Sequence, residues 1–268
     1  MQMKKIFGGL LLAIGLAHGA LAADVTPSFD NAPVGWSVDR YAAASFADVG
    51  TFQGRNNVLG IGIDSTTNSA NRTPGQTDTF YNTQGMKHAI TGGAGSVLSA
   101  DLFIDESWRS NNNGTGYVRT DMWGTMVDNG AAVAAYPIIG FTNYGGVARL
   151  RVWDEDTANG WVDLTDTIQF GAWNSFSILF TGTSFDYYVN GSMAYSYTDL
   201  TISGSTEFKE VIMQAYNFND PALGVTGSAD YTAHWANADA ANDVPEPASL
   251  ALVGVALAGL GIARRRKA

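Results

Sequence analysis

Alternation of apolar and polar residues is the feature that most constrains the fold of this chain. A period of two residues places successive side chains on opposite faces of a β-strand. The alternating segments are residues 96–105, 117–126, 146–153, 175–181, 185–190 and 208–218. Gly, Asn, Asp and Ser residues typical of turns separate them, and no sustained helical period appears between them. The sequence therefore predicts an all-β sandwich or jelly roll of two antiparallel sheets.

The central region, residues 23–243, has the length of one large all-β domain, and two small domains are the alternative. It contains no internal repeat and no low-complexity linker. A chain of this length buries roughly 70% of the surface that its unfolded form exposes, so its core needs no disulfide or metal. The chain has no cysteine, which excludes thiol catalysis and thiolate metal sites. No cofactor is predicted.

The charge balance excludes one class of partner. The formal net charge of the chain is −10 at pH 7. Lys4, Lys5 and the basic cluster at the C-terminus lie outside the central region, which is therefore more acidic still. Such a surface repels nucleic acid and anionic lipid headgroups unless a local basic patch overrides the repulsion. We expect no nucleic acid to bind.

The N-terminal segment, residues 1–22, has the layout of a secretory signal peptide. Lys4 and Lys5 precede a short apolar run, and Ala20 and Ala22 form a small-x-small site. We expect cleavage after Ala22, so that the mature chain works outside the cytoplasm. A retained N-terminal anchor is the alternative.

The C-terminal segment contains a second apolar run. Residues 248–263 carry no charge, and as a helix they would extend about 24 Å, a little less than the roughly 30 Å hydrocarbon core of a bilayer. Upstream prolines end this helix, and a basic cluster follows it: Arg264, Arg265, Arg266 and Lys267. Basic residues hold such an end in the cytoplasm. A membrane anchor is predicted, with a buried core helix as the alternative.

Pro245, Glu246 and Pro247, followed by this apolar helix and the basic cluster, resemble the PEP-CTERM sorting signal of Gram-negative bacteria that make extracellular polysaccharide. The resemblance covers residues 244–268. It implies export through the inner membrane, anchoring by the C-terminal helix, and recognition by an exosortase. The protein would then reach the cell surface or the extracellular matrix of a biofilm. On this interpretation the three residues are a recognition motif of a substrate, and they have no catalytic role.

A second resemblance lies in the central region. Residues 173–191 form an alternating strand, a short turn and the segment FDYYVNG, similar to hairpins of concanavalin A-like and laminin G-like domains. Residues 231–236 are similar to a late strand of the same class. The resemblance implies a concanavalin A-like jelly-roll sandwich in which Trp173 opens a core strand and is buried. Another jelly roll is the alternative, because Asn-Gly is also a common hairpin turn.

One strand face carries the candidate binding residues. Between residues 117 and 123 and again between 149 and 153, aromatic and charged side chains alternate with residues able to pack inward. The candidates are Tyr117, Arg119, Asp121, Trp123, Arg149, Arg151 and Trp153. If the two strands share a sheet, this face suits stacking on sugar rings and binding of carboxylated polysaccharide. Mutual stacking of Arg and Trp without a ligand is the alternative.

The acidic segment after residue 153 is a candidate site for a structural calcium ion. Asp154, Asp156 and Asn159 offer the oxygen ligands that Ca²⁺ takes, but without the spacing of a dedicated loop. Ordinary turn chemistry is the alternative.

Catalytic motifs are not apparent in the sequence. Retaining glycosidases hold two carboxyl groups about 5 Å apart, and hydrolases of this fold supply them from an E-x-D-x-x-E strand, which this sequence lacks. The sequence therefore favours a non-catalytic protein that binds polysaccharide or forms part of a matrix. A glycoside hydrolase or polysaccharide lyase on the same scaffold and a purely structural surface protein are the alternatives.

Overall fold

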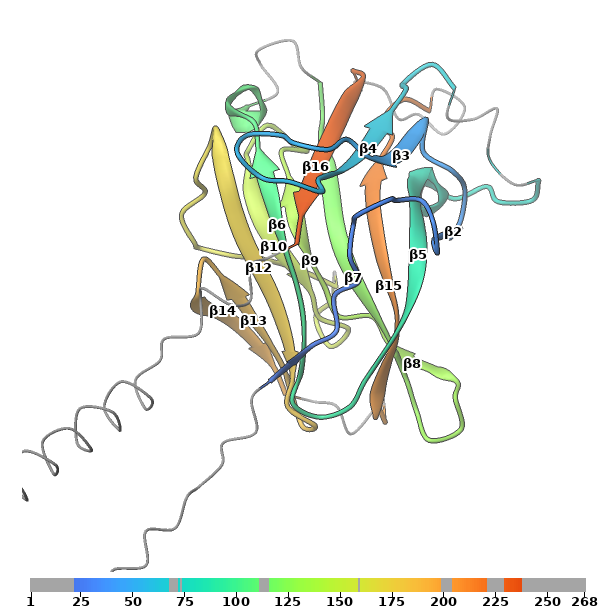
Figure 1. The fold of residues 1–268 in the computed structure, drawn as a ribbon, viewed down its shortest axis with the longest axis vertical. Helices are drawn as coiled ribbons and strands as arrows, with labels where there is room; N and C mark the ends of the chain where they lie inside the picture. Colours follow the sequence, from blue (N-terminus) through green and yellow to red (C-terminus); the bar gives the residue numbers. More distant parts are fainter. Residues whose placement is uncertain are drawn as a thin grey trace, which may run out of the picture.

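The computed structural model describes residues 22–67, 72, 74–110, 116–158, 160–198, 204–220 and 229–237. These residues form two antiparallel sheets of eight strands, packed as two layers (Figure 1). The predicted all-β jelly-roll sandwich is therefore confirmed.

The first layer, which we call the β6 sheet, has the strand order β14-β13-β12-β6-β16-β4-β3, with the short β1 pairing parallel to β6. Its strands are β1 (Ala23–Asp24), β3 (Ser45–Asp48), β4 (Leu59–Ile63), β6 (Ser96–Ile104), β12 (Ala172–Phe180), β13 (Phe185–Val189), β14 (Ser192–Tyr197) and β16 (Tyr231–Ala236).

The second layer, the β7 sheet, has the order β11-β10-β9-β7-β15-β5-β2, with β8 pairing with β7. Its strands are β2 (Ser37–Val38), β5 (Thr83–Gly92), β7 (Arg119–Val127), β8 (Val133–Ala135), β9 (Ile138–Thr142), β10 (Arg149–Trp153), β11 (Trp161–Asp163) and β15 (Glu207–Tyr216). The structure also contains two 3₁₀ helices: η1 (Thr79–Asn82) precedes β5, and η2 (Glu106–Arg109) follows β6.

The main core lies between the two layers. On β12, Phe176, Ile178 and Phe180 are buried while Ser177 and Leu179 between them are partly exposed, as the alternation predicts. Burying each such side chain contributes about 1.5 to 3 kcal/mol. Across the core, the Trp235 indole N–H donates to Thr120 Oγ1 at 2.9 Å and so joins β16 to β7.

The predicted strands are confirmed in position. The six alternating segments correspond to β6, β7, β10, β12, β13 and β15, with ends that differ by a few residues. The β12–β13 hairpin forms as expected, and residues 231–236 are β16. Between β13 and β14, Asn190 and Gly191 have φ angles of 48° and 77°, the left-handed values that a tight turn needs.

Trp173 departs from the sequence prediction. We expected it in the core, but it lies partly exposed on the outer face of the β6 sheet, because odd positions of β12 point outward. There its indole N–H donates to the carbonyl of Gln53 at 3.0 Å. Gln53 belongs to residues 49–58, a segment between β3 and β4 that we call the strap.

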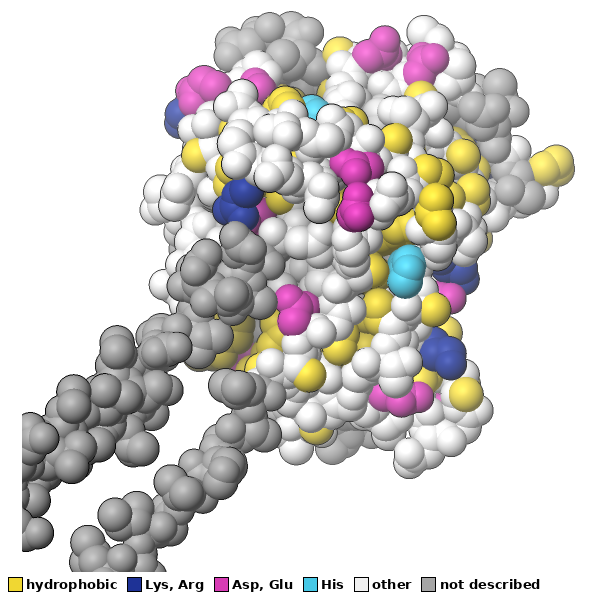
Figure 2. Space-filling view, viewed as in Figure 1, with side chains coloured by type: hydrophobic (Ala, Val, Ile, Leu, Met, Phe, Trp, Pro, Cys, Tyr) yellow, Lys and Arg dark blue, Asp and Glu magenta, His cyan; other side chains and the backbone are white. Residues whose placement is uncertain are grey.

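The strap crosses the outer face of the β6 sheet, in front of β16 (Figure 1). Phe52 stacks on His234 with 3.8 Å between ring centroids, and Arg55 pairs with the buried Asp101 at 2.6 Å. The charged side chains visible from this side are scattered and form no basic patch (Figure 2). The strap thus packs against part of the outer face of the β6 sheet, through Trp173, His234 and Asp101.

Candidate functional site

Strand register brings the sequence-predicted residues onto one face. Asp121 of β7 and Arg151 of β10 both pair with Gly140 of β9, which lies between them. Because side chains alternate, Trp123 and Trp153 share the outer face of the β7 sheet with these residues. Val118 and Met122, which alternate with them, are buried in the main core. The two candidate strands thus belong to one sheet and present one surface.

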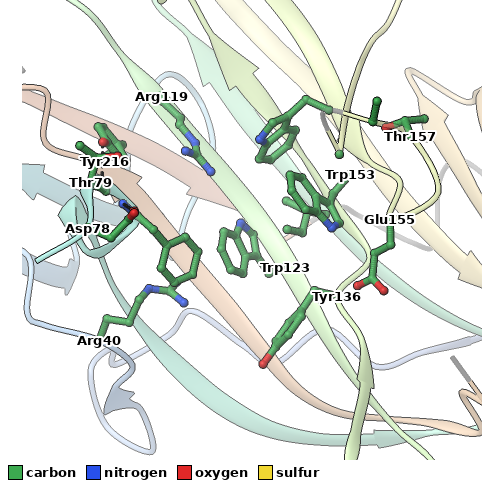
Figure 3. A pocket seen from close by; sticks show the side chains of 15 residues that line it. Arg40, Asp78, Thr79, Arg119, Trp123, Tyr136, Trp153, Glu155, Thr157 and Tyr216 are labelled. Atoms are coloured by element: carbon green, nitrogen blue, oxygen red, sulfur yellow. Dashed lines mark hydrogen bonds between the residues drawn. The ribbon is translucent and has the colours of Figure 1, made fainter. Parts of the chain in front are cut away.

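A groove of about 720 Å³ lies on this surface (Figure 3). Five strands of the β7 sheet contribute to its floor, through Arg119, Trp123, Ile138, Trp153, Trp161 and Tyr216. One wall consists of Arg40, Asp78 and the start of η1, and the other of Tyr136 and the β10–β11 turn. Its volume falls within the range of about 300 to 1,000 Å³ that is typical of ligand pockets.

The aromatic side chains of the floor form a second apolar cluster. Trp123, Ile138 and Ile212 are buried together outside the main core, and Trp153 and Trp161 pack against them. The guanidinium of Arg40 lies 4.6 Å from the Trp123 ring centroid. Trp123 is consequently only 3% exposed, so its ring supports the floor and does not offer a free stacking surface.

The accessible aromatic rings lie around Trp123. Phe80 on η1 is 45% exposed and Tyr136 is 37% exposed, and both line the groove. Trp153 is half-buried, with its ring against Gly160 and its edge toward Trp161. The Tyr136 and Trp153 rings border the groove in Figure 3. Sequence reasoning missed Phe80, Tyr136 and Arg40, because they lie outside the alternating strands and carry no periodic signal.

Beside the aromatic cluster, Asp121 organises the polar half of the site. Its Oδ2 accepts from Arg119 Nε at 2.6 Å and from Gln214 Nε2 at 3.4 Å, and Arg151 Nη2 lies 3.9 Å from Oδ1. Gln214 in turn accepts from Arg40 at 2.6 Å. This buried network of polar groups connects the wall of the groove with its floor.

Arg151 occupies an unusual environment. Its guanidinium lies 3.7 Å from the Trp161 ring centroid, and Arg119 lies 4.9 Å from the same ring. Burial, with repulsion from Arg119, lowers the pKa of Arg151 to about 9. Within the described residues, Nε and Nη2 of Arg151 have no hydrogen-bond partner.

Tyr117 and Arg149 lie at the margin of this face. Tyr117 contacts Tyr144 and Phe218, whose rings stack at 5.2 Å. Arg149 donates to Asp163 at 2.9 Å and to the carbonyls of Tyr144 and Val147. All these contacts of Arg149 are with protein atoms, so it supports the adjacent loop.

The calcium candidates adopt ordinary turn contacts. Asp154 is buried, and its carboxylate accepts from the Tyr195 hydroxyl and from the backbone N–H of Asp156 at 2.9 Å. Asn159 lies outside the described residues. In the part of the chain that the structure describes, no group of three or more His, Asp or Glu side chains is placed to hold a metal ion.

Two carboxylates line the groove, Asp78 and Glu155. Burial raises the pKa of Glu155, which is a property of some catalytic acids. The two groups nevertheless lie on opposite sides of the groove, with the Trp123 and Trp153 rings between them (Figure 3). Glycosidases place a carboxyl pair on either side of one glycosidic bond, and Asp78 and Glu155 do not form such an adjacent pair.

Three solved structures are similar to the sandwich. A β-glucanase of Bacillus licheniformis is 14% identical with a TM-score of 0.42, over 78% of this chain and 94% of its own. A structure described under endo-acting O-glycanases of human gut microbiota that initiate mucin breakdown is 11% identical with a TM-score of 0.47, over 79% and 90%. The carbohydrate-binding module CBM66 of Bacillus subtilis is 12% identical with a TM-score of 0.35, over 68% and 91%. No curated protein matches the chain.

The C-terminus is identified by a family model. Residues 243–267 match the PEP-CTERM protein-sorting motif, which confirms the resemblance carried by Pro245, Glu246 and Pro247. The motif indicates export, C-terminal membrane anchoring before processing by an exosortase, and then surface localisation. The predicted helix, residues 248–263, and residues 1–21 of the predicted signal peptide lie outside the described residues. No helix within the described ranges is long and apolar enough to cross a membrane.

Proposed function

We propose that this exported sandwich binds extracellular polysaccharide through the groove on the β7 sheet and does not cleave it. The observation that supports the proposal is the combination of accessible rings, Phe80, Tyr136 and Trp153, with the partly exposed Arg119 and the buried Arg151 on the same sheet face. Flat aromatic surfaces with a few fixed polar groups are typical of sites that orient a ligand. A protein sorted to the cell surface would meet such polymers in the matrix around the cell.

Binding isotherms test the proposal. The protein is first measured against an array of bacterial exopolysaccharides, and the tightest partner is then titrated into variants. Phe80→Ala and Tyr136→Ala should each weaken binding about tenfold, equivalent to about 1.4 kcal/mol, with little change in Tm because both rings are exposed. Met193→Ala is the matched control, because Met193 is 63% exposed on β14 of the other sheet. Unchanged binding in both aromatic variants, or no binding to any polymer, would refute the proposal.

Release of reducing ends distinguishes binding from hydrolysis. We expect none from any polymer that the protein binds. Release that disappears in Glu155→Gln would instead identify a glycoside hydrolase that uses Glu155 as its acid.

A further inference from the structure

The polar half of the site contains more positive than negative charge. Arg149 pairs with Asp163 at 2.9 Å and Arg119 pairs with Asp121 at 2.6 Å. Arg151 has no carboxylate of its own, since its nearest ion-pair contact is the same Asp121 at 3.9 Å. In an acidic protein, this local excess of positive charge is a specific feature of the site.

Arg151 also makes few hydrogen bonds for a buried charged group. It is 7% exposed, and two of its nitrogens have no hydrogen bond within the described residues. A buried charge without full pairing is unfavourable, and the lowered pKa of Arg151 has the same cause. An anion brought against this cluster would supply the missing charge.

A pocket of about 280 Å³ lies beside the cluster. Arg119 and Arg151 line it together with the Tyr144, Tyr216 and Phe218 rings. Arg119 and Tyr216 also line the main groove, so the pocket and the groove adjoin. A polymer lying in the groove could therefore place one sugar residue in the pocket.

We propose that this pocket is a subsite for the carboxylate of a uronic acid residue, so that the protein selects acidic polysaccharides. The inference rests on the proposed function of the groove. A guanidinium group matches a carboxylate in geometry and donates charge-assisted hydrogen bonds to it. The Tyr144 and Phe218 rings provide apolar surface for the sugar ring beside that contact.

Carboxyl reduction tests the inference on the unmodified protein. Alginate, polygalacturonate and hyaluronate are titrated at one ionic strength beside their carboxyl-reduced, neutral forms. We expect at least one acidic polymer to bind at least about tenfold more tightly than its reduced form. A difference of this size is what the loss of a hydrogen bond to a charged group produces. Dextran sulfate should bind more weakly than that polymer. Equal binding of acidic and reduced forms, or tighter binding of dextran sulfate, would overturn the carboxylate assignment.

A substitution at Arg151 tests whether this residue causes the preference for the acidic form. Arg151→Gln should lose the preference for the acidic form, whereas Arg109→Gln, which removes the same charge from an exposed pair with Glu106, should keep it. A preference that persists in folded Arg151→Gln would contradict the inference. If the acidic and the reduced polymers bind equally and Phe80→Ala weakens that binding, the groove remains the binding site and only the acidic subsite is wrong. If no polymer binds, both proposals fail.

Discussion

Gly140 leaves the space in which Asp121 meets its two arginines. A methyl group built at this position would overlap Asp121 Oδ1 and the carbonyl of Thr120. We predict that Gly140→Ala lowers the free energy of unfolding by about 1 to 3 kcal/mol, the usual cost of overpacking, and also weakens polysaccharide binding. Chemical denaturation and binding isotherms measure the two effects.

Gly93 provides the control for this substitution. A methyl group there would meet its nearest neighbour, the carbonyl of Thr206, at 3.9 Å, an ordinary contact. Gly93→Ala should therefore leave both properties close to those of the wild type. Equal destabilisation by the two substitutions would show that the space at Gly140 has no special role.

Substitution of Trp123 tests whether this residue supports the floor of the groove or belongs to its accessible surface. Because it is buried under Arg40 and packs on Ile138 and Ile212, we predict that Trp123→Ala destabilises the fold by about 3 to 5 kcal/mol. Phe80→Ala should change stability by less than about 0.5 kcal/mol, as exposed positions usually do. Thermal denaturation compares them, and a wild-type Tm for Trp123→Ala would disprove this assignment.

At the residue scale, strand parity predicted which side chains share a face, but not which of them are accessible. The alternation around Trp123 correctly separated it from Met122. Its burial depends on Arg40, which is far away in the sequence and follows a two-residue strand. The prediction that Trp173 is in the core is wrong for a similar reason: the strap that contacts it on the outer face has no periodic pattern.

At the scale of elements, the strap is expected to respond to pH. Partial burial lowers the pKa of His234, while Asp105 acts in the opposite direction. The unfolded chain therefore binds more protons than the folded chain as pH falls through the ordinary value of about 6.5. The stabilisation that neutral His234 contributes is fully present above that value, and it is lost as pH falls toward the pKa of His234 in the folded chain.

The prediction is a smaller acid-induced fall in Tm for His234→Phe than for the wild type, between about pH 7.5 and pH 5. The new ring can still stack on Phe52, so the strap should stay in place at the higher pH. Amide hydrogen exchange of residues 49–58 gives the local measurement. If the variant and the wild type lose Tm equally, His234 is not the group responsible.

Some strands could be predicted and others could not, for physical reasons. In β6 and β12, apolar residues recur at every second position over residues 98–104 and 176–180, because that side faces the core. β4 reads LGIGI, in which glycine replaces the polar position, because Val49 of the strap and Ser45 of β3 pack close to its backbone. β5 has polar residues on both of its faces, so it shows no alternation. Its place inside the sheet depends on its pairing with β15 and β2.

At the scale of the whole molecule, we expect the sandwich and the sorting motif to have separate roles. We predict that deleting residues 245–268 moves the protein from the membrane fraction to the soluble periplasm, because the predicted anchor is removed. Replacing Pro245 and Glu246 with alanine should instead leave the protein in the membrane, unprocessed, since the recognition motif is lost and the helix is kept. Fractionation and immunoblotting distinguish the two outcomes, and unchanged membrane association after the deletion would contradict the prediction.

The groove itself could not be predicted from the sequence. It depends on the register of five neighbouring strands and on side chains contributed by loops, and neither is encoded in local periodicity. The strand face that forms its floor was predictable, because Arg119, Asp121 and Trp123 alternate with core residues within one strand.

We propose that polysaccharide binds on the outer face of the β7 sheet. Indole N–H resonances of the ¹⁵N-labelled tryptophans test this most directly during titration with the tightest-binding polymer. We expect shifts for Trp153 and Trp161, which line the groove, and none for Trp173, whose indole N–H donates to the strap on the other sheet. Shifts at Trp173 with none at Trp153 and Trp161 would contradict this proposal.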